Sequence, residues 1–324
     1  MAGGEEPLYH VTPELAKQTL AAALRTWLPG RTWNQIRKLV EDRQVTVCGN
    51  LCLDPARRLK AGDPVRVLPK PALPPPKAHD VEVVYSDTHV IVVEKPPGLT
   101  TVRHPEEAKL PARRRQVQPT LDELMPRILS RHETPGKRGG APGRIRPVHR
   151  LDRDTSGLLI FARTEAAERH LGHQFRLRTI HRRYLAVAVG RVEAQTIESR
   201  LVINRGDGRR GSTTFPDVGQ EATTHVRPVE FLEGYTLVEC RLETGRTHQI
   251  RIHLSERGHP VAGDRVYHQP LHAPPIPDVS GAARLALHAA ELGFEHPETG
   301  KHMRFDSPLP ADMQELVERW RKRS

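Results

Sequence analysis

A proline-rich stretch at residues 68–80 divides the chain into two parts. Its sequence is Leu-Pro-Lys-Pro-Ala-Leu-Pro-Pro-Pro-Lys-Ala-His-Asp. Proline fixes φ and lacks a backbone N–H, so such a stretch is extended and semi-rigid and forms neither a helix nor a central strand. A chain of 324 residues is long enough for two domains. We therefore expect a small domain at residues 1–67, a linker at 68–80 and a larger domain at 81–324.

Residues 1–67 have the pattern of a small α/β module. Thr12-Pro13 is typical of a helix start, because a hydroxyl cap precedes proline at the first helical position. The apolar stripe that follows comprises Leu15, Leu20, Leu24 and Leu28. Thr32 and Gln35 have the spacing of a capping box, which predicts the start of a second helix. Short apolar runs on both sides of Gly49-Asn50 predict a hairpin with a two-residue turn.

This module resembles the RNA-binding domain first described in ribosomal small-subunit protein four. The resemblance lies in the helix pair, the basic second helix, the Val-x-Val-x-Gly turn and the closing Gly-Asp-x-Val. Arg43 and Cys48 depart from it, since that family usually has glycine and asparagine there. The resemblance implies that three basic residues of the second helix bind RNA: Arg31, Arg37 and Lys38. A generic module of two helices and a hairpin is the alternative.

Residues 81–324 alternate between strand-like and helix-like segments. Apolar runs at 81–85, 89–93, 158–161, 184–189 and 235–242 predict strands. Residues 121–129 and the segment after Thr164-Glu165 predict helices. No internal repeat of fixed period is present. The pattern indicates an α+β domain.

The charge of the chain favours a polyanionic partner. The formal net charge is +11 and 4% of the residues are aromatic, so phosphate contacts by Arg and Lys are expected rather than broad stacking platforms. Charge alone fits a solvated basic surface equally well. The basic runs include Arg113, Arg114 and Arg115, within a segment at 103–146 that we expect to grip RNA phosphates.

Cysteine and hydropathy patterns indicate the compartment. Three cysteines are too few and too scattered for a disulfide framework, which favours a reducing environment. No apolar run reaches transmembrane length, and the acidic N-terminus lacks the apolar core of a signal peptide. We therefore expect a cytoplasmic protein that does not bind membranes. Neither the cysteines nor the scattered histidines have the spacing of a zinc site, so no metal is expected.

The most informative segment for function runs from residue 149 to 158, His-Arg-Leu-Asp-Arg-Asp-Thr-Ser-Gly-Leu. Asp152 and Asp154 lie beside arginines, and a nearby positive charge keeps a carboxylate ionised. An ionised carboxylate in a substrate cleft can act as a nucleophile or a base. On this segment alone a surface ion pair is the commoner explanation.

Five segments together resemble the RluA-type pseudouridine synthases, which convert uridine in RNA to its carbon-linked isomer. The first is His-Arg-Leu-Asp-x-x-Thr-Ser-Gly at 149–157, and the others lie at 182–187, 244–254, 258–267 and 285–297. They follow the order of that family, and five ordered motifs are far more specific than one. The resemblance implies an α+β pseudouridine synthase fold with a largely antiparallel mixed sheet and flanking helices.

The resemblance also implies roles for individual residues. Asp152 would be the catalytic carboxylate, since Asp154 falls on a variable position, but the sequence does not show whether Asp152 attacks the sugar. Arg251 would pair with Asp152, and Tyr184 would pack on the flipped base and take part in proton transfer. Arg150 would contact the backbone or fill the space that the base leaves. Further substrate-binding residues would be His149, Thr155, Arg246 and His248. The chemistry requires no cofactor.

The partner implied is RNA. The combination of module and synthase domain most resembles enzymes of large-subunit ribosomal RNA, while relatives that modify transfer RNA leave that substrate open. We expect a monomer. Two rivals from other classes remain: an RNA-binding or ribosome-assembly factor without catalysis, and a metal-dependent nuclease. The intact Asp152, Tyr184 and Arg251 argue against the first, and the histidine spacing argues against the second.

Overall fold

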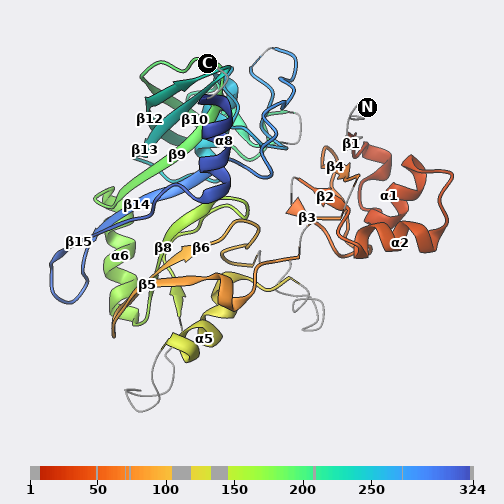
Figure 1. Ribbon diagram of the computed structural model, residues 1–324. Coiled ribbons are helices and arrows are strands. Elements are labelled where there is room, and N and C mark those ends of the chain that lie inside the picture. Colours follow the sequence, from red (N-terminus) through yellow and green to blue (C-terminus); the bar gives the residue numbers. More distant parts are fainter. Residues whose placement is uncertain are drawn as a thin grey trace. The chain divides into compact units, whose positions relative to one another are not determined.

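The computed structural model describes residues 8–48, 50–69, 71–72, 74–103, 118–132, 145–206, 209–271 and 273–321. The chain forms two compact units (Figure 1). The first comprises Met1–Pro74 and Arg200–Gln220, and the second comprises Pro75–Ser199 and Glu221–Ser324. The division between them thus falls inside the proline-rich stretch, and residues 200–220 are grouped with the N-terminal unit.

The N-terminal part of the first unit is a four-stranded antiparallel sheet with two α-helices. The strand order is β1-β4-β2-β3, and Val47 lies opposite Asn50 at the hairpin. Apolar residues from both helices and from β2 and β4 form one buried cluster. The elements are β1 (Leu8–His10), η1 (Pro13–Leu15), α1 (Leu20–Trp27), α2 (Trp33–Glu41), β2 (Val45–Val47), β3 (Asn50–Leu51) and β4 (Pro64–Val67).

The starts of the two helices show where local sequence determines structure. At α2 the predicted capping box is present, with Thr32 and Gln35 each bonding the other's backbone N–H. The first helix starts later than predicted. Pro13 begins only a 3-10 turn, Lys17 takes the left-handed conformation with φ 68°, and the side chain of Thr19 caps α1. A positive φ at a lysine ends a helical run, and no pattern of apolar residues reveals it.

The large sheet is mixed and mostly antiparallel, as predicted. Its strand order is β11-β10-β12-β13-β9-β14-β8-β6-β5, with β15 on β14 and β7 on β8. β14 and β8 are parallel, with His288 opposite Ser156, whereas β13–β9, β9–β14 and β8–β6 are antiparallel. The elements are η2 (Ala78–Asp80), β5 (Glu82–Ser86), β6 (Val90–Lys95), α5 (Leu121–His132), β7 (Arg146–Pro147), β8 (Ser156–Ala162), α6 (Glu165–Leu177), β9 (His181–Val189), β10 (Gln195–Val202), β11 (Gly211–Thr213), β12 (Gln220–Leu232), β13 (Tyr235–Leu242), α7 (Gln249–Glu256), β14 (Leu287–Glu295), β15 (His302–Asp306) and α8 (Ala311–Arg321).

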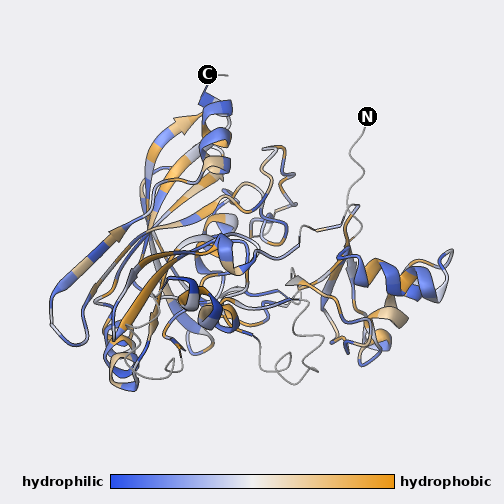
Figure 2. Ribbon diagram, turned by 60° about the horizontal axis from the view of Figure 1, so that its bottom comes forward, coloured by the Kyte–Doolittle hydropathy of each residue, from blue (hydrophilic) through white to orange (hydrophobic). Residues whose placement is uncertain are grey.

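Both faces of the strand that follows residues 149–155 are buried. Every residue of β8 is buried, and alternate residues enter two different clusters. Leu158 and Ile160 pack with α6, while Leu159 and Phe161 belong to the cluster that contains apolar residues of α5, α7 and α8. In Figure 2 the strands inside the second unit carry much of the orange colour that marks hydrophobic residues, which agrees with this core. A strand held on two faces is a rigid base for the turn before it.

Part of the basic segment lies outside the described residues, including Arg113, Arg114 and Arg115. The helix predicted at 121–129 is present as α5. Among the described residues, no helix combines the length and the apolar character needed to span a membrane.

Candidate active site

A cleft of about 480 Å³ in the second unit brings together residues from distant parts of the sequence. Its lining comes from the segment before β8, the end of α6, the start of β9 and the loop between β13 and α7. The predicted residues that line it are His149, Arg150, Asp152, Thr155, Tyr184, Arg246, His248 and Arg251. Asp154 does not line it, and its half-exposed side chain lies 4.0 Å from Arg153.

Asp152 is held in the cleft between the side chains of Arg251 and His248. Its side chain is 17% exposed. Nη1 of Arg251 donates to its Oδ2 at 3.3 Å, and Nε2 of His248 lies 3.8 Å from its Oδ1. Burial raises the pKa of this carboxyl, but the charges of His248 and Arg251 and the hydrogen bond outweigh burial and hold the pKa below its ordinary value. Asp152 is therefore ionised at neutral pH.

Arg251 is oriented mainly by a second carboxylate, Asp264. Nε and Nη2 of Arg251 donate to the two oxygens of Asp264 at 2.7 and 2.9 Å, a bidentate geometry that fixes the guanidinium plane. The side chain of Asp264 is fully buried, and its Oδ1 also accepts the backbone N–H of Val266 and Tyr267. Burial raises the pKa of Asp264, yet the charge and hydrogen bonds of Arg251 leave that pKa below its ordinary value. The pair presents a fixed donor to Asp152.

His248 is oriented in a similar way. It precedes α7 in the left-handed conformation with φ 61°, which places its ring at the start of the helix. Nδ1 forms a hydrogen bond of 2.8 Å with the hydroxyl of Tyr267, and the two rings meet edge to face. The ring of Tyr267 also lies 4.9 Å from the guanidinium carbon of Arg251. Tyr267 thus supports both Arg251 and His248, the two neighbours of Asp152.

The backbone around Asp152 is fixed by a buried lysine. Nζ of Lys95 donates to the carbonyls of Pro96, Leu99 and Arg153 at 2.9, 2.9 and 3.0 Å, so it joins the loop after β6 to the loop that carries Asp152. Burial lowers the pKa of Lys95 to about 7. Three carbonyl acceptors satisfy the three donors of its ammonium group.

Gly157 lets β8 approach β14 closely. Its φ is +113°, and a Cβ at this position would lie 2.3 Å from the carbonyl oxygen of Ala289. A residue with a side chain cannot take this place in the parallel pair without moving the backbone. The Thr-Ser-Gly part of the motif therefore anchors the turn in which Thr155 N–H donates to the carbonyl of Asp152.

Tyr184 reaches the cleft from β9, opposite Ala289 on β14 and Cys240 on β13. It is 7% exposed. Burial and the charge of Asp152 raise the pKa of its phenol despite an opposite effect of Arg182, so the hydroxyl is protonated at neutral pH. It can therefore offer a flat apolar face and a proton, but not a phenolate.

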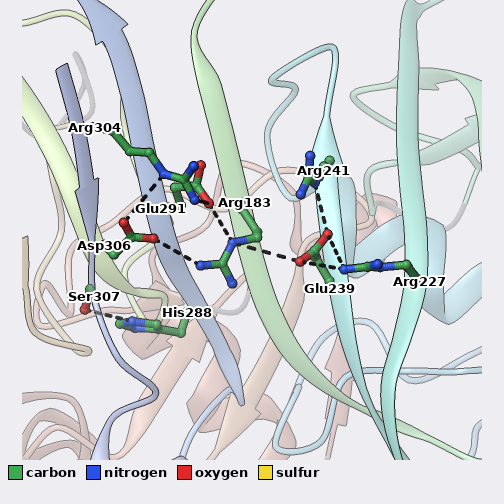
Figure 3. A network of polar contacts seen from close by, with 9 residues as sticks. All are labelled: Arg183, Arg227, Glu239, Arg241, His288, Glu291, Arg304, Asp306 and Ser307. Atoms are coloured by element: carbon green, nitrogen blue, oxygen red, sulfur yellow. Dashed lines mark hydrogen bonds and ion pairs between the residues drawn. The ribbon is translucent and has the colours of Figure 1, made fainter. Parts of the chain in front are cut away.

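The other face of β9 is tied to its neighbours by ion pairs (Figure 3). Nε of Arg183 donates to Glu291 on β14 at 2.8 Å and lies 3.9 Å from Glu239 on β13. Arg304 and Arg241 add further contacts to the same two glutamates. Arg183 precedes Tyr184, so this network holds the strand in register on the face away from the cleft.

Comparison with known proteins agrees with this geometry. A family model described as RNA pseudouridylate synthase matches residues 89–256. The chain is 37% identical over 314 residues to a ribosomal large subunit pseudouridine synthase D of Zymomonas mobilis, covering 94% of this chain and 95% of that protein. It is 38% identical over 298 residues to an uncharacterised RNA pseudouridine synthase of Bacillus subtilis, covering 89% of each. The chain belongs to the RNA pseudouridylate synthase family.

A solved structure shows the same fold. Human RNA pseudouridylate synthase domain containing 4 superposes with a TM-score of 0.58 at 22% identity, over 74% of this chain and 93% of that one. The family and the α+β fold predicted from the five motifs are thus confirmed, and the chain is an enzyme of the pseudouridine synthase type. The family match does not support the alternative of a metal-dependent nuclease.

The remaining predicted residues of the synthase differ in their freedom to bind substrate. Arg150 is exposed and makes no hydrogen bond or ion pair with another described residue. Nε of Arg246 donates to the carbonyl of Glu221 at 3.0 Å. Nε2 of His149 accepts the N–H of Ile160 at 3.1 Å, and burial, with the charge of Arg182, lowers its pKa to about 3. His149 is thus a neutral ring occupied by a backbone contact.

Two of the predicted RNA-binding residues of the first unit, Arg37 and Lys38, lie on the exposed side of α2, whereas Arg31 precedes the N-cap Thr32 and is not part of the helix. Arg31, Arg37 and Lys38 are all exposed and form no ion pair with another described residue. Trp33, on the same helix, is 50% exposed. Buried Ile36, Leu39 and Val40 occupy the opposite face.

Sequence reasoning missed several residues that shape the cleft. Asp264 and Tyr267 lie in the motif at 258–267, to which the sequence assigned no role in the site. A carboxylate and a phenol at fixed spacing after a glycine could have indicated one. Gln249 is another, since its amide bridges Thr244, Thr224 and two backbone groups beneath the cleft. The lining residues that were not predicted also include Phe175, Arg176, Arg178, Arg182 and Gly245.

Two other buried histidines, His253 and His288, have hydrogen-bond partners of their own. His253 bonds Thr224 and Ser199, and His288 bonds Ser156 and Ser307. In the residues that the structure describes, no group of three or more His, Cys, Asp or Glu side chains could hold a metal ion.

Proposed function

We propose that this enzyme converts uridines of large-subunit ribosomal RNA to pseudouridine, with Asp152 as the catalytic carboxylate. The observation that carries the assignment is the ionised Asp152 in a basic cleft, fixed between Arg251 and His248. The substrate class is supported by the names of relatives, among them the ribosomal large subunit pseudouridine synthase D of Zymomonas mobilis, which aligns over 94% of this chain.

The reaction is an isomerisation, so atoms and charge balance within the nucleotide. The bond from the sugar C1′ to N1 of uracil breaks, the base turns, and C1′ bonds to C5. The proton leaves C5 and N1 gains one. Two carboxylates line the described cleft, Asp152 and Glu243. Glu243 is half-exposed and already paired with His225 at 2.7 Å, so Asp152 is the group available to the sugar or the ring.

Tyr184 and Arg150 serve the flipped nucleotide in this proposal. Flipping a base out of a folded RNA costs about a few kcal/mol, which contacts in the cleft must offset. The buried, protonated ring of Tyr184 supplies an apolar face for uracil near Asp152. Arg150 is exposed, unpaired among the described residues and next but one to Asp152, which suits it to the RNA backbone or to the space that the base leaves.

The first unit contributes RNA affinity in this proposal. Its resemblance to the domain of ribosomal small-subunit protein four rests on the helix pair and the hairpin, both of which the described residues contain. The exposed face of α2 combines Arg37 and Lys38 with Trp33, a mixture of cations and an aromatic ring that suits phosphates and an unpaired base.

Conversion of labelled RNA tests the proposal directly. Unmodified large-subunit ribosomal RNA and transfer RNA transcripts with labelled uridine are incubated without metal with the wild type, Asp152→Asn or Asp154→Asn, then digested and analysed for pseudouridine. We expect the wild type and Asp154→Asn to modify ribosomal RNA, and Asp152→Asn to be inactive although folded.

Three outcomes contradict parts of this proposal. Pseudouridine formation by Asp152→Asn refutes the role of the carboxylate. Modification of transfer RNA alone refutes the substrate. RNA binding without any product from the wild type favours an RNA-binding or assembly factor that has lost activity.

A further inference from the structure

Arg182 is a cation in the cleft with no side-chain hydrogen bond or ion pair to another described residue. It lies on β9 two residues before Tyr184, so both side chains emerge on the same face of the sheet, and both line the cleft. Its Nε is buried and lacks a hydrogen-bond partner, and the guanidinium makes no ion pair with another described residue. Buried polar atoms are nearly always paired in folded proteins, so a partner that arrives with the substrate is expected.

The surroundings hold the Arg182 guanidinium in place without neutralising it. Its central carbon lies 5.4 Å from the centre of the Phe175 ring, a cation–π contact. On another side, a Cβ added to Gly245 would lie 2.6 Å from Nη1. The guanidinium therefore lies directly against Gly245 and would have to shift if a side chain were present there. Phe175 in turn packs against His149, with ring centres 4.9 Å apart. The Arg182 guanidinium thus has a defined place between the Phe175 ring and Gly245.

The charges of the cleft leave Arg182 uncompensated. Asp152 is engaged by Arg251 and His248, and Glu243 lies near His225 and Arg178. These are the two carboxylates among the lining residues. Against them stand six arginines: Arg150, Arg176, Arg178, Arg182, Arg246 and Arg251.

We propose that Arg182 binds a phosphate of the RNA backbone directly beside the target uridine. The inference rests on the proposed function, because it takes RNA as the substrate. The anions of an RNA chain are its phosphodiesters, and the guanidinium fork matches two phosphate oxygens. Carbonyl oxygens of uracil are neutral, so a contact with the base would leave the charge of Arg182 unpaired in a partly desolvated place. The phosphate fixes the nucleotide so that its sugar meets Asp152.

Removal of a single backbone charge tests the assignment. A short synthetic RNA containing the uridine that the wild type modifies is prepared in three forms: with all phosphates, and with an uncharged methylphosphonate on the 5′ or on the 3′ side of that uridine. Single-turnover rates of pseudouridine formation are measured for the wild type, Arg182→Gln and Arg182→Lys. Arg241→Gln is the matched control, because it removes the same charge from an exposed side chain on the face of Figure 3.

On the all-phosphate RNA, Arg182→Gln should be slower by about tenfold to a hundredfold, the usual effect of a lost charge-assisted contact. One of the two methylphosphonates should slow the wild type by a similar factor, and on that RNA Arg182→Gln should add no more than about twofold. Arg182→Lys should recover part of the rate and remain sensitive to the same methylphosphonate, since it keeps the charge. Arg241→Gln should match the wild type throughout.

Several results overturn the inference. If neither methylphosphonate slows the wild type, no phosphate beside the uridine is bound, whatever the folding of the variants. If Arg182→Gln is slowed by the same factor on all three RNAs, Arg182 contacts the base or the sugar instead. If the wild type forms no pseudouridine in any RNA, the proposed function itself fails and the phosphate assignment fails with it, so the two failures are distinguishable.

Discussion

Replacing Asp264 with asparagine removes a buried charge from the pair that orients Arg251. The wild-type carboxylate is fully buried and accepts two hydrogen bonds from Arg251, at 2.7 and 2.9 Å, and two from backbone N–H groups. Loss of one partner from a buried ion pair costs about 3–5 kcal/mol. The asparagine oxygen can still accept the backbone N–H of Val266 and Tyr267, so we expect the lower end, about 3 kcal/mol.

Activity should fall with stability, because Asp152 is then the one carboxylate among the described residues that still pairs with Arg251. A guanidinium freed from Asp264 can move toward Asp152, whose Oδ2 is 3.3 Å away, and a shift of about 1 Å in a reacting group costs about a hundredfold in rate. Single-turnover rates for Asp264→Asn should therefore drop by about tenfold to a hundredfold even at temperatures where the variant is folded.

Asp312→Asn supplies the matched comparison. Asp312 forms the same bidentate pair with Arg284, at 2.6 and 2.9 Å, but its side chain is 42% exposed, so its loss should cost less than about 1 kcal/mol. Urea unfolding at pH 7 measures both variants. The pKa of Asp264 is below its ordinary value, so its stabilisation is complete above about pH 4 and is lost as the pH falls further. The difference in unfolding free energy between the wild type and Asp264→Asn should therefore become smaller below about pH 4. Equal costs for the two variants at pH 7 would refute the argument from burial.

Three further changes follow from other parts of the molecule. Gly157→Ala places a Cβ 2.3 Å from the Ala289 carbonyl and should lower the unfolding free energy by about 3 kcal/mol, whereas Gly234→Ala, with open space around it, should cost about 1 kcal/mol in thermal unfolding. Burial lowers the pKa of His288 to about 4, so the folded state does not bind a proton that the unfolded state binds below about pH 6.5. The unfolding free energy should therefore fall by about 3 kcal/mol as the pH drops from about 6.5 to about 4. In urea unfolding at a series of pH values, His288→Asn should lack the part of this decrease that His288 causes. Residues 113–115 lie outside the described residues. Changing these three arginines to glutamine should weaken RNA binding and reduce the slope of log binding constant against log salt concentration by about 2–3. An unchanged slope would contradict the role of that basic segment.

Local signals in the sequence predicted local structure well. The capping box at Thr32 and Gln35 needs only four consecutive residues, and the structure contains it. The strand at 158–161 and the helix at 121–129 are apolar runs whose burial follows from their own composition. The predicted start of the first helix was wrong, because the true start depends on the positive φ of Lys17, which the spacing of apolar residues does not indicate.

The site depended on contacts that no local pattern encodes. Asp152 and Arg251 are 99 residues apart in the chain, and the choice of Asp152 over Asp154 came from family motifs rather than from the charges around them. The role of Asp264 follows only once the fold places it against Arg251. Arg182 is a further example. It stands out because its buried Nε has no hydrogen-bond partner among the described residues, and such a missing partner can be recognised only in three dimensions.

The arginines of the cleft show how one residue type serves two opposing demands. A carboxylate that reacts must be ionised, which requires nearby cations, while a cleft that binds RNA needs cations that are not already neutralised. Asp264 separates these demands, because it saturates Arg251 and thereby keeps that guanidinium from pairing fully with Asp152 or with a phosphate. Arg182 has an aromatic ring and a glycine as neighbours instead of a carboxylate, so its charge remains available to the substrate. The function of each arginine is therefore set by the neighbour that the fold provides.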